Sequence, residues 1–119
     1  MNFLLVFIGG GIGCVLRFCI GLLLQKTKTT LPWATFIANL LACVIFAVIV
    51  WFFINKPQFN SYIKPLVLIG FCGGLSTFSS FGYETFLLFK QGLAFYAVLN
   101  ILINTLLCTV IYLPLSKYV

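Results

Sequence analysis

The residues best suited to chemistry gather in one stretch, from Gly70 to Glu84, inside an otherwise apolar run. The stretch contains four glycines, five hydroxyl side chains and the only acidic residue of the chain. Glycines weaken a helix, and hydroxyl groups compete for its backbone hydrogen bonds. In hydrocarbon such a segment is tolerated only where it faces protein or a watery cavity. The pattern favours a broken helix that lines a polar path; the alternative is a continuous helix whose small residues allow close packing.

Other polar side chains recur at helical spacing in two further apolar runs. Thr35 and Asn39 are four residues apart, and Tyr96, Asn100 and Asn104 follow the same spacing, so each set shares one helix face. An amide in hydrocarbon must find a hydrogen-bonding partner. That partner is either a neighbouring helix or a permeating species, and the spacing alone leaves both open.

Two aromatic residues and one cation complete the set of candidates. Phe78 and Phe81 are three residues apart, so their rings share a face and either pack or present their positive edges to an anion. Arg17 lies seven residues before the end of the first apolar run, roughly 10 Å deep at 1.5 Å per residue. A charge at that depth either snorkels to the surface or faces water.

Composition defines the elements that must position these residues. The chain has 119 residues, of which 63% are hydrophobic and 7% charged, and it has no histidine. This composition is that of an integral membrane protein, and a spanning helix needs roughly 20 apolar residues. Four such runs are present, at about 3–24, 33–54, 63–89 and 93–115. We therefore expect an all-α membrane protein with a single four-span domain over 1–119 and a broken third helix.

The charged residues and cysteines exclude several classes of function. The net charge is +6, but the seven cations are scattered along the chain with no basic stripe, so we expect no nucleic acid partner. One acid and no histidine leave little material for an acid/base or metal site, so we expect no enzyme. The five cysteines all lie in apolar runs without a Cys-x-x-Cys pair and are interpreted as small buried hydrophobic residues.

The loop lysines predict an unusual assembly. Lysine and arginine normally accumulate on the cytoplasmic side, but here three lysines fall on each side of the four predicted spans. A chain without an orientation preference could insert both ways. This balance suggests an antiparallel dimer with its two-fold axis in the membrane plane.

Taken together, these motifs resemble the Fluc (CrcB) family of bacterial fluoride channels. The resemblance runs through all four spans. The matching patterns are Gly9-Gly10-x-x-Gly13-x-x-x-Arg17, Thr35-x-x-x-Asn39, the stretch from Gly70 to Glu84, and Tyr96-x-x-x-Asn100. The third is highly specific, whereas the glycines of the first would be weak evidence alone.

The resemblance implies a multi-pass protein of the bacterial plasma (inner) membrane. It implies a dual-topology homodimer with two pores that lets fluoride leave the cell passively. Asn39 would be the pore asparagine, and the ring edges of Phe78 and Phe81 would meet fluoride. The residues that would extend the polar track are Ser79, Thr35, Tyr96 and Asn100.

The resemblance also implies a structural sodium ion at the dimer axis. Its ligands would be backbone carbonyl groups in the helix break, which correspond to Gly73 and Ser76. Arg17 would lie near an aqueous vestibule and attract anions.

The chain departs from the family pattern at several positions, among them Ser76 and Ser80, where the family has threonine. Ala34 and Ala42 stand where glycine is frequent, and Asn100 stands where serine is usual, which keeps a donor but changes its reach. Some family members work as pairs of unlike chains, so a second, paralogous chain remains an alternative to the homodimer.

Two rival functions remain at this stage. A small multidrug-resistance-type exporter is also a four-span protein, but its proton coupling needs a membrane-embedded carboxylate, typically in the first span. The first span has none, and Glu84 lies near the end of the third. A membrane assembly subunit without transport activity is the other rival.

Overall fold

The computed structural model describes the whole chain, Met1–Val119, and every regular element in it is a helix. Four helical segments are long and apolar enough to cross a membrane. The elements are α1 (Asn2–Leu24), α2 (Trp33–Phe53), η1 (Phe59–Cys72), α3 (Gly73–Leu75), α4 (Phe78–Lys90), α5 (Ala94–Val110) and η2 (Leu113–Lys117). The third span comprises η1, α3 and α4, and the fourth comprises α5 and η2.

The bounds of the third and fourth spans differ from those predicted. The third span begins at Phe59 rather than near residue 63, and it has π-type hydrogen bonding as far as Cys72. Its first turns contain Asn60, Ser61 and Lys64, which carry no apolar signal but can form a helix where headgroups and water satisfy polar groups. In the fourth span the α-helix ends at Val110, and a short 3₁₀ helix containing Pro114 follows.

The predicted break in the third helix is confirmed, but its position needs a correction. Ser76 and Thr77 are extended, with φ/ψ of −76°/153° and −147°/118°. Gly73, which we placed in the break, is helical at φ −65° and ψ −34°. The glycines therefore do not interrupt the helix, and the hydroxyl residues after them do.

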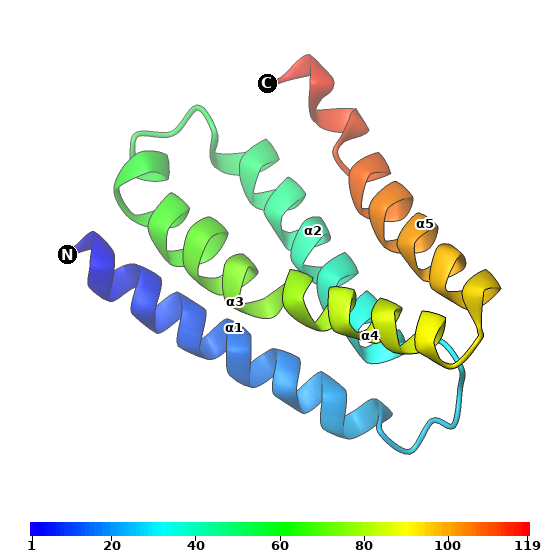
Figure 1. The fold of residues 1–119 in the computed structure, drawn as a ribbon. Helices are drawn as coiled ribbons and strands as arrows, with labels where there is room; N and C mark the ends of the chain where they lie inside the picture. Colours follow the sequence, from blue (N-terminus) through cyan, green and yellow to red (C-terminus); the bar gives the residue numbers. More distant parts are fainter.

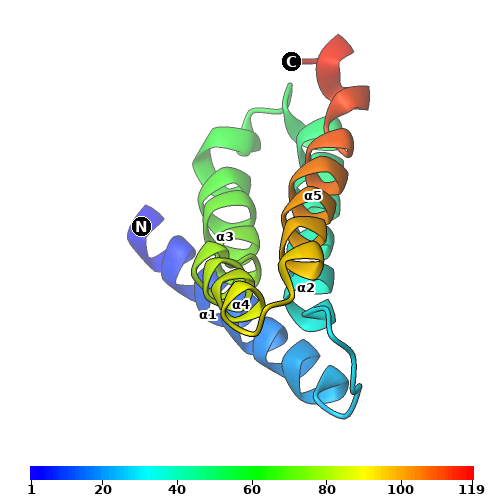
Figure 2. The ribbon, with the colours of Figure 1, turned by 45° about the vertical axis from the view of Figure 1, so that its right-hand side comes forward.

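The glycines instead form a seam between α1 and the first half of the third span. A Cβ atom on Gly9, Gly13 or Gly74 would collide with backbone atoms of the opposite helix, and one on Gly70 would lie 2.9 Å from the carbonyl oxygen of Val6. The two helices lie side by side in both ribbon views (Figures 1 and 2). Close packing, the alternative interpretation, is thus correct for Gly70 and Gly74, and the break begins directly after them.

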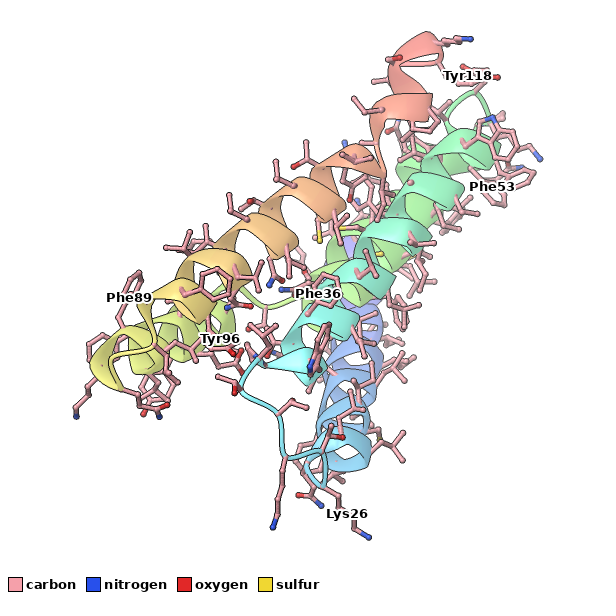
Figure 3. All side chains as sticks on the ribbon, turned by 90° about the vertical axis from the view of Figure 1, so that its right-hand side faces the viewer. Lys26, Phe36, Phe53, Phe89, Tyr96 and Tyr118 are labelled. Carbon is pink, nitrogen blue, oxygen red and sulfur yellow. The ribbon has the colours of Figure 1, made fainter.

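The four spans alternate in direction, so the first and third loops lie at one end of the molecule. Figure 3 shows Lys26 and Phe89 toward that end, with Phe53 and Tyr118 toward the other. The second and fourth spans run parallel and side by side (Figure 2). Ala38, Ala42, Cys72 and Leu75 form the buried core where α2 meets the third span.

Candidate functional site

The side chain of Asn39 on α2 forms hydrogen bonds with the backbone at the helix break. The backbone N–H of Thr77, which lacks a helical partner, donates to Asn39 Oδ1 at 2.8 Å. Asn39 Nδ2 in turn donates to Asn104 Oδ1 at 3.3 Å and lies 3.5 Å from the carbonyl oxygen of Thr77. One amide side chain therefore satisfies the extended backbone at membrane depth, where an orphaned N–H would be costly.

The hydrogen bonds continue from Asn39 across α5 to α4. Asn104 Nδ2 donates to Oδ1 of Asn100 at 3.0 Å, and Asn100 Nδ2 donates to Thr85 Oγ1 at 3.0 Å. Thr85 Oγ1 donates to the carbonyl oxygen of Phe81 at 2.8 Å. Asn100 and Asn104 are both buried, so the stripe on α5 serves to bind the neighbouring helices.

The first turn of α4 presents unpaired backbone donors beside the break. Thr77 caps this helix, since its Oγ1 accepts from the N–H of Ser80 at 3.2 Å. The N–H groups of Phe78 and Ser79 donate to no acceptor within the chain. A helix N-terminus carries partial positive charge, so these donors favour an anion.

A cavity of about 270 Å³ opens at the break between α2, α4 and α5. Asn39, Thr77, Phe78, Phe81 and Asn104 contribute to its lining. The Phe81 ring is buried, whereas Phe78 is 84% exposed, and their ring centroids lie 5.7 Å apart at an interplanar angle of 48°. Three of the predicted pore residues, Asn39, Phe78 and Phe81, therefore share one cavity.

A second cavity, of about 310 Å³, lies on the other side of Thr77, toward the first loop. Arg17, Thr35, Ser80 and Glu84 line it together with Thr77 itself. Thr35 Oγ1 donates to Glu84 Oε1 at 2.7 Å, while Glu84 Oε2 is buried without a partner. This second cavity therefore brings together Arg17 and Thr35. They are the remaining residues of the first two spans with a predicted role in handling the ion.

Neither cavity is lined by four of the predicted site residues, which are Gly73, Ser79, Tyr96 and Asn100. Tyr96 is 37% exposed on α5 and packs edge-on against Phe95, with ring centroids 5.5 Å apart. Ser79 is exposed, with its hydroxyl 3.4 Å from Thr77 Oγ1. Conversely, Thr77, Thr85 and Asn104 belong to the site but were not among the predicted pore residues. The four-residue spacing after Asn100 was the available signal for Asn104.

The carbonyl groups around the break are suited to a hard cation. The carbonyl of Gly73 accepts no hydrogen bond within the chain because the Thr77 N–H is bound to Asn39, and that of Ser76 accepts none because the Ser80 N–H is bound to Thr77 Oγ1. Unpaired carbonyl oxygens at an unwound membrane helix are typical ligands of small cations. The predicted sodium ligands therefore fit such an ion.

These features define a class: a multi-pass membrane protein whose third helix breaks beside a cavity of amide, hydroxyl and aromatic groups. Comparison with known proteins narrows it. Residues 4–114 match the family described as CrcB-like protein, Camphor Resistance (CrcB), and the chain belongs to this family.

Several curated relatives share most of this sequence. The fluoride-specific ion channel FluC of Azobacteroides pseudotrichonymphae genomovar. CFP2 is 43% identical over 84% of this chain and 81% of the relative. The protein of the same name from Klebsiella pneumoniae (strain 342) is 44% identical over 85% and 80%. That from Pectobacterium carotovorum subsp. carotovorum (strain PC1) is 36% identical over 98% and 94%. The similarity thus extends through all four spans.

Proposed function

We propose that this chain is a fluoride-selective channel that lets fluoride leave the bacterial cell passively across the plasma membrane and so protects it against fluoride toxicity. The observation that carries the proposal is the cavity at the break, where the Asn39 amide and the rings of Phe78 and Phe81 meet. The names of the relatives point the same way. A channel performs no covalent chemistry, so the protein is not an enzyme.

The cavity has the donors that a dehydrating anion needs. Fluoride is small and strongly hydrated, so a pore must replace its water with N–H and O–H groups and positive ring edges. Asn39 Nδ2, the two unpaired N–H groups of α4 and the rings of Phe78 and Phe81 supply such groups. No cationic side chain lines this cavity, which favours release, since a pore that binds too tightly cannot conduct.

Arg17 would act before the anion reaches this cavity. It lines the neighbouring cavity toward the first loop, where a positive charge raises the local concentration of anions. Ser80 in the same lining offers a hydroxyl donor for the next step inward, and Thr35 lines the path with its own hydroxyl bound to Glu84. Ser79, Tyr96 and Asn100 extend the polar track in this proposal, with Asn100 acting through its hydrogen bond to Asn104.

A second copy in antiparallel orientation would complete the pore. Phe78 is 84% exposed directly beside polar backbone, and Gly73 in the same region has open space where a side chain would be. Both features leave room at this surface for another protein chain. Because the loop lysines are balanced, a copy of opposite orientation is the partner we propose; an unlike paralogous chain is the alternative that co-purification would reveal.

The dimer axis in this proposal holds the sodium ion. The free carbonyl oxygens of Gly73 and Ser76, doubled by a second copy, would provide oxygen ligands without a charged side chain. The ion would supply fixed positive charge that joins the two copies. It takes no part in moving fluoride.

Fluoride efflux from liposomes that contain the purified protein tests this function. We expect rapid fluoride efflux without a proton gradient and far slower chloride efflux. Fluoride efflux equal to that of empty liposomes, or equal movement of chloride, would refute the proposal. The multidrug exporter is not supported, because α1 contains no acid and Glu84, the only carboxylate, is bound to Thr35.

A further inference from the structure

Two cysteines that the proposed function leaves unused face each other beside the candidate pore. Cys43 on α2 and Cys108 on α5 both line the cavity that contains Asn39 and Phe81.

The register of α2 against α5 brings the two cysteines to the same level of the cavity. Asn39 and Asn104 are joined by a hydrogen bond of 3.3 Å, and Cys43 and Cys108 each follow four residues later. One further turn along, the rings of Phe46 and Tyr112 are 5.9 Å apart. Parallel helices in this register bring successive turns into contact, so the thiol pair is fixed by the same packing as the asparagine pair.

The chemistry of the pair selects a narrow class of ligand. Thiolates prefer soft cations, and two ligands suit a metal that is satisfied by linear coordination. A tetrahedral site needs more ligands, and no group of three or more histidine, cysteine or acidic side chains is placed to hold a metal. The lining of this cavity contains no carboxylate, which is the group that would favour a hard cation instead.

The charge of the bound cation narrows the class of ligand further. Two thiolates and a divalent cation form a neutral unit, whereas two thiolates with a monovalent cation would leave a net negative charge in a low-dielectric region. Binding breaks two S–H bonds, forms two metal–sulfur bonds and releases two protons to water, with no change of oxidation state. No oxidant or reductant is needed.

We propose that Cys43 and Cys108 form a site for a soft divalent cation with linear coordination, of the Hg²⁺ type, and that its occupancy blocks the cavity beside Asn39 and Phe81. The metal would lie one helical turn from the hydrogen bond between Asn39 and Asn104. A bridge between α2 and α5 at this point also prevents the two helices from separating. The block of fluoride movement rests on the proposed function, whereas binding of the metal does not.

The binding test uses the purified full-length chain and Hg²⁺ as the probe. We expect intact-mass measurement to show one tightly held mercury, with two fewer thiols available to a maleimide. The double variant Cys43→Ser/Cys108→Ser should lose this mercury. The matched control Cys14→Ser/Cys19→Ser, which changes two exposed cysteines on α1, should retain it.

Fluoride efflux from liposomes gives the second measurement. Hg²⁺ should stop most of the efflux through the wild-type chain and through the Cys14/Cys19 control, but not through the Cys43/Cys108 double variant. If that double variant elutes as an aggregate, Cys43→Ala/Cys108→Ala replaces it in both measurements.

The two measurements separate the two proposals. Retention of the tightly held mercury by a folded Cys43/Cys108 variant would overturn the metal site. So would block of that variant's efflux by Hg²⁺. Mercury bound at the pair in a protein that moves no fluoride would instead overturn the proposed function and leave the site standing.

Discussion

Replacing Gly13 by alanine tests the glycine seam between α1 and the third span. A Cβ atom there would collide with the carbonyl oxygen of Phe71 and lie 2.8 Å from the amide nitrogen of Leu75. Both neighbours are backbone atoms, so no side-chain rotation relieves the contact and the two helices must move apart. Gly11, in the same helix, has no atom within 4 Å of the same position, and Gly11→Ala is therefore the matched control.

Two contributions decide how far each variant changes the free energy of unfolding, and one of them is the same for both variants. Alanine favours a helix over glycine by about 1 kcal/mol at either position. Overpacking adds a cost of about 1–3 kcal/mol at Gly13 alone. The free energy of unfolding should therefore be about 1–3 kcal/mol lower for Gly13→Ala than for Gly11→Ala, because the helix-propensity gain cancels in the comparison.

Reversible unfolding of both variants in mixed detergent micelles measures this difference directly. The transition of Gly13→Ala should come at a lower denaturant fraction, while that of Gly11→Ala should match or exceed the wild type. Equal unfolding free energies for the two variants would show that α1 and the third span are not held at backbone contact. The close approach described above would then be wrong.

Three further predictions concern the break and the cavity beside it. Thr77→Ala removes the acceptor that caps the Ser80 N–H and should lower the unfolding free energy by about 1 kcal/mol. Thr77→Ser keeps the hydroxyl and should keep most of the stability. Equal unfolding free energies for the two variants would contradict the cap. Phe81→Ile removes the positive ring edge from the cavity, so it should sharply reduce fluoride efflux while the protein keeps its elution volume. Unchanged efflux would mean that the ring only packs. Replacing sodium by a large organic cation should weaken the proposed dimer in cross-linking experiments, and indifference to sodium would argue against carbonyl ligation at Gly73 and Ser76.

The four spans and the existence of the break could be predicted from the sequence. Hydropathy defines a spanning run directly, and clustered glycines and hydroxyl residues signal a conflict with helix formation. The exact position of the break could not be predicted, because it depends on a partner far along the chain. The Thr77 N–H leaves the helix since Asn39, 38 residues away, offers it an acceptor.

The site was predicted in part, for a geometric reason. Residues at intervals of four drift by about 40° per step around a helix of 3.6 residues per turn. Asn100 and Asn104 are close enough in direction to bond each other, but Tyr96 is turned about 80° from Asn104 and leaves the cavity. Which polar groups meet across helices depends on packing, and no spacing rule contains that information. The roles of the predicted pore residues remain predictions.

Thr77 lines both cavities, so a layer about one residue thick separates them near the middle of the third span. Where each cavity fills with water from its own end, the membrane voltage falls mainly across that layer rather than over the full hydrocarbon thickness of about 30 Å. A unit charge that passes Thr77 then experiences nearly the whole electrical work, about 2.3 kcal/mol per 100 mV, in a single step. The conductance of such a pore depends on voltage chiefly through the residues that touch this layer.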